Sequence, residues 1–274
     1  MSAVEAIKHQ RAIGVARIGV AGIDGTTRLR TLYQQGCAKL RMPSRDGHDG
    51  LEAVFINSSG GVTGGDSIDL SIHVEANATL TLTTQACERA YRSNGGVGHI
   101  SNRAVVNDGA RLLWLPQETI LFDGSALHRE TTIELAPTAE LLMVEPLLLG
   151  RSASGEAVRS LSFREKRSIH RDGRLLHAER LRLDGPAPVE ATFGFSNNTA
   201  CASLLFVSPR AEAMAEPLRA IVSEIGGVAC WTEGALAGKL SARILAADGY
   251  MLRKTLLPAI ALLADGAVPK IWMT

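Results

Sequence analysis

The stretch Ser67–Glu75, SIDLSIHVE, decides the fold class of this chain. Its isoleucine, leucine and valine residues alternate with aspartate, serine, histidine and glutamate, which is a period of two residues. Successive side chains of a β-strand point to opposite faces, so the pattern predicts a strand with one buried and one wet face. Thr79–Thr84, TLTLTT, repeats the alternation with β-branched residues after the turn Ala76–Ala78.

Similar strand signals fill the first two thirds of the chain. They are separated by the turn pairs Asp24-Gly25, Asp46-Gly47, Asp108-Gly109 and Asp172-Gly173. Many short strands at regular spacing predict a mainly β fold of stacked layers, not βαβ units. The further predicted strands are Val15–Val20, Thr27–Gln35, Leu51–Asn57, Ile100–Asn107, Arg111–Leu115, Leu127–Leu135, Glu140–Val144, Ser160–His170 and Arg174–Leu183.

Two helices are predicted toward the C-terminus. Ser208-Pro209 is typical of an N-cap followed by proline in the first turn, and Gly226-Gly227 is expected to end that helix. A second helix is predicted over Gly249–Ala264, where Pro258 should kink or interrupt it. Strands are predicted between the helices at Val228–Thr232 and Lys239–Ala246. The buried face of the first helix should carry Met214, Leu218, Ile221, Val222 and Ile225.

Length and composition predict one domain over residues 1–274, β-rich over 15–207 and mixed α/β over 208–274. The loosest segment, Asp184–Asn198, is rich in proline, glycine and asparagine and is predicted to be either a mobile loop or a segment that a partner orders. The net charge of +1 indicates neither a nucleic-acid nor a membrane partner. Four scattered cysteines and an N-terminus without a signal-peptide core favour the reducing cytoplasm.

Searches for enzymatic chemistry find little. The glycine-rich run Gly60–Gly65 leads into a strand and lacks the GK[ST] of a phosphate loop. The string Gly150–Gly155 misses the spacing of a nucleophile elbow. The seven histidines form no HxH, HExxH or i, i+4 pair, so no tight metal site is expected. We therefore predict that the chain is not an enzyme.

Three polar stretches interrupt the strand pattern. Gly60–Asp66 ends in a carboxylate, Thr83–Ser93 crowds Gln85, Tyr91 and Arg92, and Trp114–Asp123 places Glu118 and Asp123 among bulky apolar residues. Carboxylates beside large apolar side chains are either exposed at a sheet edge or buried in a polar network.

These stretches resemble the urease accessory protein family UreD, called UreH in some organisms. The family patterns are close to NPPGG(L/V)xGGD, TTQ(A/G)AxKxYRS and WLPQExIxFxxA. This sequence reads NSSGGVTGGD at Asn57–Asp66, TTQACERAYRS at Thr83–Ser93 and WLPQETILFDGSAL at Trp114–Leu127. Leu147–Glu156, His177–Gly185 and the final VPKIWMT are similar to three further family motifs, and the resemblance runs from about residue 15 to 274. Ser58-Ser59 replaces the usual proline pair, and Cys87, Glu88 and Arg89 depart from the usual residues.

The resemblance implies a body of stacked, helicoid-like β-sheets with two helices. It also implies a chaperone role in nickel insertion into apo-urease, within a complex that contains the helical adaptor UreF and, through UreF, the GTPase UreG. A water-filled passage through the protein is the proposed nickel route in the family. No tightly bound cofactor is implied, only nickel in transit, which weak oxygen ligands would release.

Five carboxylates in or beside matched motifs are the candidate lining or supports of that route: Asp66, Glu118, Asp123, Glu145 and Glu179. Buried carboxylates need cationic partners, and Arg92, Arg151 and Arg180 are the predicted ones. Gln85, Tyr91 and Ser154 are further motif residues expected at the site. Two alternatives stay open: a passive scaffold that nickel never enters, and a hydrolase on a β-sandwich.

Overall fold

The computed structural model describes residues 10–43, 50–151, 155–185, 195–222, 224–233 and 237–273. The turn pair Asp46-Gly47, residue Ser154 and the greater part of the predicted loop Asp184–Asn198 lie outside these ranges. The chain is mainly β, with seventeen strands and two α-helices among the described residues, which confirms the predicted fold class.

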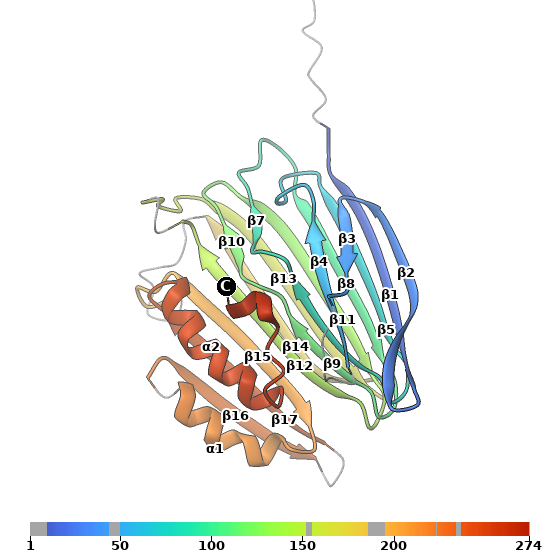
Figure 1. Cartoon of the computed structure of the whole chain (residues 1–274). Coiled ribbons are helices and arrows are strands. Elements are labelled where there is room, and N and C mark those ends of the chain that lie inside the picture. The colour runs from blue at the N-terminus through green and yellow to red at the C-terminus, as the bar shows by residue number, and fades with distance from the viewer. Residues whose placement is uncertain are drawn as a thin grey trace, which may run out of the picture.

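Two sheets lie face to face (Figure 1). The seven-stranded sheet has the order β14-β13-β11-β8-β5-β1-β2, and the ten-stranded sheet has the order β16-β17-β15-β12-β9-β6-β4-β3, with β10 pairing to β12 and β7. The strands of the first sheet are β1 (Ile13–Ile23), β2 (Thr26–Gly36), β5 (Ser67–Val74), β8 (Gly98–Val106), β11 (Ala126–Leu135), β13 (Leu161–Arg171) and β14 (Arg174–Gly185). Those of the second are β3 (Ala38–Arg41), β4 (Leu51–Asn57), β6 (Thr79–Thr84), β7 (Glu88–Ala90), β9 (Arg111–Leu115), β10 (Thr119–Leu121), β12 (Glu140–Leu149), β15 (Ala200–Ser208), β16 (Gly226–Glu233) and β17 (Ala237–Ala246).

The chain passes repeatedly from one sheet to the other. From β4 to β13 the chain alternates between the sheets, with β6–β7 and β9–β10 as successive strands of the second sheet. As a result β1, β5, β8, β11 and β13 become parallel neighbours in the first sheet. Each crossing turns the apolar residues of an alternating strand toward the space between the sheets. The main core therefore lies between the sheets, with Ile18, Leu70, Leu112, Met143 and Phe163 among its members.

Hairpins join the two antiparallel pairs of the seven-stranded sheet. Asp24-Gly25 and Asp172-Gly173 have positive φ at both residues, which is the backbone of a tight hairpin turn between twisted strands. These two turns are confirmed. Asp108-Gly109 instead links β8 to β9 in the other sheet, with only the glycine at positive φ.

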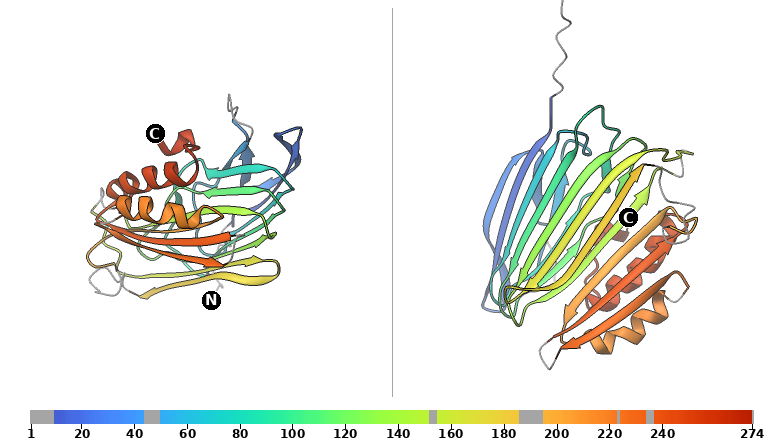
Figure 2. Two further views of the ribbon diagram at one scale, coloured as in Figure 1. Left: turned by 90° about the horizontal axis from the view of Figure 1, so that it is seen from below. Right: turned by 180° about the vertical axis from the view of Figure 1, so that it is seen from behind.

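Both helices cover one part of the ten-stranded sheet. Helices α1 (Ala211–Val222) and α2 (Gly249–Leu263) lie on the same side of β15–β17, as the views in Figure 2 show. A second apolar cluster fills that layer, with Phe206, Leu218, Leu240, Leu256 and Trp272. The short helix η2 (Lys270–Met273) closes the layer by burying Trp272.

The start of α1 differs from the prediction. Ser208 pairs with Gly238 as the last residue of β15, and its Oγ accepts a hydrogen bond from the Arg210 N–H at 3.2 Å. Because Ser208 belongs to the sheet, the helix begins only at Ala211, and it ends at Val222 before the predicted glycine stop. Leu218 and Val222 are buried as predicted, whereas Ile225 lies beyond the helix.

Pro258 does not interrupt α2, which runs unbroken from Gly249 to Leu263. Pro258 has no N–H to donate to the Lys254 carbonyl oxygen, and both residues lie on the exposed side of the helix. The Asp248 carboxylate caps the helix by accepting the Met251 N–H at 2.8 Å.

Strands β3, β7, β10 and β15 were not predicted. Ala200–Ser208 is buried along nearly its whole length, because one face meets the core between the sheets and the other meets the helices. A strand buried on both faces loses the alternation that reveals strands in sequence. The extension of β12 to Leu149 was missed for the same reason.

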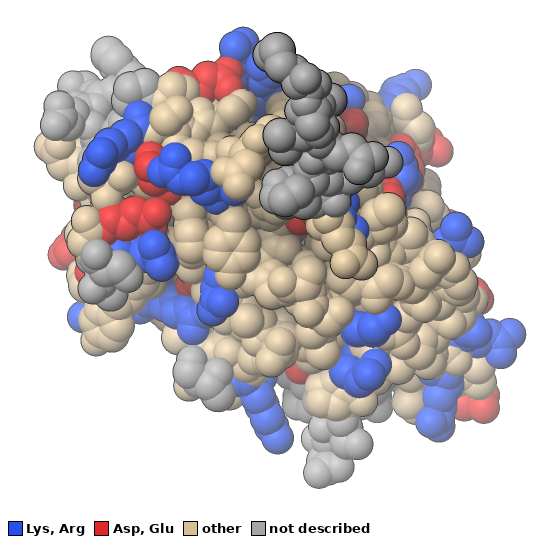
Figure 3. Space-filling model, turned by 90° about the horizontal axis from the view of Figure 1, so that it is seen from above, with Lys and Arg blue, Asp and Glu red and all other residues tan. Residues whose placement is uncertain are grey.

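Charged side chains of both signs mix on the end of the molecule shown in Figure 3, around a largely uncharged area. No helix among the described residues is long and apolar enough to cross a membrane.

Candidate functional site

The three polar stretches of the sequence meet at one end of the molecule. Val62 bridges to Ala90, and β7 pairs with β10 through Glu88 opposite Thr119. The Tyr91 N–H donates to the Val62 carbonyl oxygen at 2.8 Å. Segments far apart in sequence thus form one polar surface.

The glycine-rich loop is packed against the second stretch. A Cβ on Gly61 would overlap the Tyr91 ring, and one on Gly64 would overlap the Ser93 hydroxyl. Tyr91 also donates its hydroxyl to the Gly60 carbonyl oxygen at 3.2 Å and meets Phe122 edge to face at 5.1 Å. The glycines therefore allow close approach of two backbone segments.

Asp66 holds this loop in shape. Its Oδ1 accepts the Ala12 N–H and its Oδ2 accepts the Thr63 N–H, both at 2.8 Å. The residue is buried. Both carboxylate oxygens accept backbone N–H groups, so Asp66 stabilises the conformation of the loop.

Asp123 holds a second turn. Its Oδ1 accepts the backbone N–H groups of Arg159 at 2.8 Å and Ser160 at 3.0 Å, and these bonds lower the pKa of its carboxyl. Arg92 pairs with Asp123, as predicted for that arginine. Arg151 instead pairs with Glu156 at 3.0 Å, a carboxylate that the prediction did not include.

Glu118 is the centre of a buried cluster. It accepts hydrogen bonds from Arg253 at 2.7 and 2.9 Å, and from the Cys87 thiol at 3.3 Å. Burial opposes the charge of Glu118, but Arg253 holds its pKa below the ordinary value. Burial and then Glu118 raise the pKa of Cys87 to about 11, so Cys87 is a neutral thiol.

Beside this cluster a pocket of about 240 Å³ opens to the surface. Gln85 is exposed at its rim, and the inner wall includes Cys87, Glu88 and Asn57. The Glu88 Oε1 accepts a hydrogen bond from the Asn57 side-chain amide at 3.1 Å. Burial raises the pKa of Glu88 to about 7.

A second, smaller cavity of about 60 Å³ lies between the two sheets, directly inside the first. The two share Phe55, Thr84 and Glu88 in their walls, so Glu88 lies between them. Arg129 and Glu145 line the inner cavity. Its volume is sufficient for several water molecules.

Buried charges continue from this cavity through the interior. Arg129 pairs with Glu145 at 3.2 Å and with Glu165 at 2.5 Å, and Trp114 donates its indole N–H to Glu145 at 2.7 Å. Burial raises the pKa of Glu145, with repulsion from Glu165 adding to it. Burial also opposes the charge of Glu165, yet Arg129 and Arg167 hold its pKa low.

The series ends at the seam between β14 and β17. Arg167 pairs with Glu165 at 3.0 Å and with Glu179 at 2.8 Å, and Glu179 also pairs with Arg243. The His177 imidazole lies 4.0 Å from Glu179, and burial followed by nearby Lys239 lowers its pKa to about 4. Glu179 therefore stands at the far end of a charged series that begins near Glu88.

The arginines of this series were not predicted. The prediction named Arg180, but its guanidinium donates to the carbonyl oxygens of Arg167 and Glu179 and to the Ser168 hydroxyl. The residues that pair with buried carboxylates are Arg129, Arg167, Arg243 and Arg253. One signal was available, because Glu165 and Arg167 occupy the core-facing positions of an alternating strand between Phe163 and Ile169.

Within the described ranges, no group of three or more histidine, cysteine, aspartate or glutamate side chains is arranged to hold a metal ion. The candidate site is thus a surface pocket, an inner cavity and a series of paired charges.

Comparison with known proteins gives a consistent result. Residues 12–273 match the protein family described as UreD urease accessory protein. The chain is similar to the urease accessory protein UreD of Agrobacterium fabrum, with 43% identity over 98% of this chain and 94% of that protein. It is 45% identical to the protein of the same name from Rhizobium leguminosarum bv. trifolii, over 99% of both chains. The corresponding protein of Mesorhizobium japonicum is 44% identical over 96% of this chain and 94% of its own.

Proposed function

Because the chain belongs to the UreD family of urease accessory proteins, we propose that it conducts nickel through its interior to apo-urease. Family membership itself makes the chain an accessory protein of urease maturation and not an enzyme. The hydrolase alternative is therefore set aside.

The proposed partners are the adaptor UreF, the GTPase UreG held through UreF, and the subunits of apo-urease. The resemblance of the motifs supports this set. The proposed place of action is the cytoplasm, where GTP is available to the GTPase. The four cysteines, all free thiols, are compatible with a reducing compartment.

One observation carries the nickel route: Glu88 lies in the wall of both the surface pocket and the inner cavity. We propose that nickel enters at the pocket rim near Gln85, passes Glu88, and follows Glu145 and Glu165 toward Glu179. Two buried polar atoms, Thr83 Oγ1 and Arg167 Nε, have no hydrogen-bond partner within the described parts of the chain. Buried polar atoms are normally hydrated when the protein does not satisfy them, which supports a wet interior.

Paired charges suit passage of an ion. Carboxylate oxygens bind nickel weakly compared with thiolates or imidazole clusters, so an ion held by them can leave. When no ion is present, the guanidiniums of Arg129 and Arg167 form ion pairs with Glu145 and Glu165. These pairs are needed because an unpaired buried carboxylate destabilises the fold. Nickel is accordingly proposed as cargo, and no tightly bound cofactor is proposed.

The scaffold alternative is favoured by a different observation. Both oxygens of Asp66 accept backbone N–H groups, Asp123 is bound by backbone N–H groups and Arg92, and Glu118 is bound by Arg253. These three candidates hold the structure together, as a protein that only positions its partners would require.

Substitution at Glu88 separates the two functions. Nickel content and activity of urease are measured after incubation of apo-urease with UreF, UreG, GTP, bicarbonate, nickel and this chain. We expect Glu88→Trp, which fills the passage, to form the complex and yet load urease at least tenfold more slowly. Glu212→Trp, on the exposed first turn of α1, is the matched control and should load normally.

Normal loading by a complex that contains Glu88→Trp would remove the transit proposal and leave the scaffold. Failure of the unsubstituted chain to support any loading would instead count against the accessory role with these partners.

A further inference from the structure

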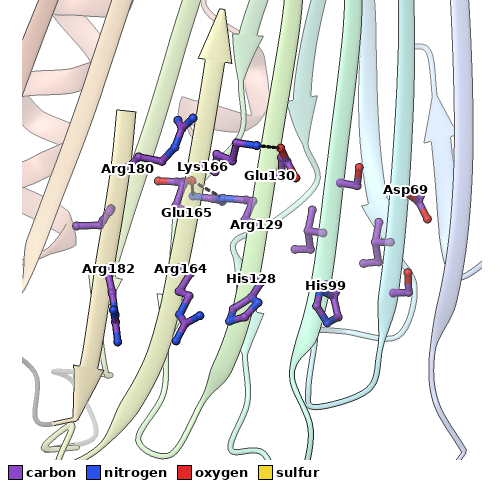
Figure 4. A pocket seen from close by; sticks show the side chains of 15 residues that line it. Asp69, His99, His128, Arg129, Glu130, Arg164, Glu165, Lys166, Arg180 and Arg182 are labelled. Atoms are coloured by element: carbon purple, nitrogen blue, oxygen red, sulfur yellow. Dashed lines mark hydrogen bonds and ion pairs between the residues drawn. The ribbon is translucent and has the colours of Figure 1, made fainter. Parts of the chain in front are cut away.

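A groove of about 500 Å³ lies on the outer face of the seven-stranded sheet. Its lining includes Arg129 and Glu165, whose charged groups also belong to the buried series described above. Strands β5, β8, β11, β13 and β14 form its floor, and Figure 4 shows its lining side chains in rows across them.

One row carries four nitrogen-bearing side chains on adjacent strands, and Ser67 continues it on β5. Arg182 lies opposite Arg164 in register, Arg164 lies opposite His128, and His128 lies opposite His99. Figure 4 shows the four side chains side by side on successive strands. The two imidazole rings meet edge to face with their centroids 5.5 Å apart. Four strands at about 4.8 Å spacing make this row roughly 14 Å long.

Like charges directly opposite each other destabilise a sheet, so the Arg164–Arg182 pair opposes folding unless something compensates it. Neighbouring rows contain carboxylates, although Lys166 in one of them also lies opposite Arg180. Lys166 pairs with Glu130 at 2.7 Å, and His170 lies 2.9 Å from Glu134.

Compensation of the arginine row is incomplete. Asp184 pairs with Arg182 and lies 3.9 Å from Arg164, so one carboxylate serves two guanidiniums. The arginine side chains are 54% and 71% exposed, which leaves donors free to meet a ligand. Partial burial and the Arg164 charge lower the pKa of His128, so this ring is a neutral donor or acceptor near pH 7.

We propose that this groove is a docking surface for an acidic segment of a protein partner, whose carboxylates pair with Arg164 and Arg182 and accept hydrogen bonds from His99 and His128. A guanidinium fork matches a carboxylate in two parallel hydrogen bonds. Arg164 beside the imidazoles disfavours a metal cation at the histidine pair.

The flanking acids favour a polypeptide over a nucleic acid. Asp69 and Glu130 line the same groove one row away from the arginines. A nucleic acid has a charge on every phosphate and would bring some of them against these carboxylates. A polypeptide can place neutral residues there and carboxylates only over the arginine row.

The test is fluorescence anisotropy of a labelled peptide of about ten residues, alternating glutamate and serine, with the whole chain, in about 50 mM salt near pH 7. We expect Arg164→Glu/Arg182→Glu to weaken binding at least tenfold. The matched control is Arg28→Glu/Arg30→Glu, which changes the charge equally at exposed positions of β2, on the other edge of the sheet. It should change binding by less than about twofold.

The milder pair Arg164→Gln/Arg182→Gln replaces the reversal if circular dichroism shows that the reversed variant does not fold, with at least threefold weakening expected. Equal weakening in the control, or unchanged binding in the groove variant, overturns the proposal. Tighter binding of a ten-residue thymidine oligonucleotide, lost in the groove variant, overturns it in favour of a nucleic-acid site.

Discussion

At the scale of single residues, Glu88 is buried and lies between the surface pocket and the inner cavity. Burial raises the pKa of its carboxyl from 4.5 to about 7, so its charge changes near neutral pH. The Asn57 amide donates a hydrogen bond to it and Arg129 attracts its charge, but burial outweighs both. Deprotonation of Glu88 therefore occurs where the proposed cargo would have to pass.

This raised pKa makes stability depend on pH. The folded protein binds the Glu88 proton more tightly than the unfolded chain, so the contribution of this group is fully present below about pH 4.5. It is lost as the pH rises through about 7. Glu88→Gln removes the charge, and we expect it to raise the free energy of unfolding at about pH 8 by up to about 3 kcal/mol.

Urea unfolding at about pH 4.5 and pH 8 measures the effect. The variant should lie near the parent protein at the lower pH and above it at the higher one. Parallel pH profiles of the two proteins would show that Glu88 titrates normally.

At the scale of elements, α2 is fastened to the polar site by one arginine. Arg253 donates to Gln117 and Glu118 beyond the end of β9, and its guanidinium lies 5.6 Å from the Trp272 ring centre. Trp272 in turn donates its indole N–H to the Leu115 carbonyl oxygen at 2.9 Å. The C-terminal layer and the motif WLPQE therefore hold each other in place.

Arg253→Ala should destabilise the protein by about 3 kcal/mol, because Glu118 would remain buried without its cation. The double variant Arg253→Ala/Glu118→Gln should lose less than the sum of the single losses, since the uncompensated charge is then gone. Urea unfolding is the measurement, with exposed Lys254→Ala as the control. Strict additivity would mean that the pair contributes little coupling.

The glycine loop is a second element with a steric requirement. A Cβ on Gly64 would overlap the Ser93 hydroxyl and the Gly95 carbonyl oxygen, whereas Gly227 has open space around it. Gly64→Ala should cost about 2 kcal/mol of unfolding free energy through overpacking, and Gly227→Ala should be near neutral. Thermal unfolding of both variants is the measurement. It distinguishes the steric clash at Gly64 from any effect that replacing a glycine by alanine has at every position.

At the scale of the whole molecule, the buried charges join the two sheets. Arg129 belongs to the seven-stranded sheet, and Glu145 and Trp114 belong to the ten-stranded sheet. Arg167 and Glu179 make the same crossing to Arg243 and Ser203. The apolar core surrounds these contacts, so their register is tied to the packing of both sheets.

Arg129→Met should lower the free energy of unfolding by about 3–5 kcal/mol, because it leaves Glu145 and Glu165 facing each other without the central cation. The triple variant Arg129→Met/Glu145→Leu/Glu165→Leu should recover most of the loss. Lys166→Met, which breaks an exposed pair on the same sheet, should cost less than about 1 kcal/mol. A triple variant as unstable as Arg129→Met would show that the charges supply more than mutual compensation.

The sequence by itself determined the strand-rich class, most strand positions and the family. Alternation of period two is a local property, so SIDLSIHVE and TLTLTT predicted β5 and β6 with nearly the observed bounds. The Asp-Gly turns of the two hairpins are equally local, because Asp-Gly readily adopts the positive φ at both residues that this type of turn needs. The polar stretches were recognised because they interrupt that alternation.

Only the tertiary structure decided which charges meet. Glu118 and Arg253 are 135 residues apart in the sequence. Arg129 and Glu165 lie on β11 and β13, and no local sequence pattern shows that these two strands are neighbours. Strand β15 could not be predicted from the sequence for a related reason. Burial on both faces removes the alternation of apolar and polar residues that marks a strand. Burial and ion pairing depend on which strands the winding of the chain makes neighbours, and that order is a property of the whole fold.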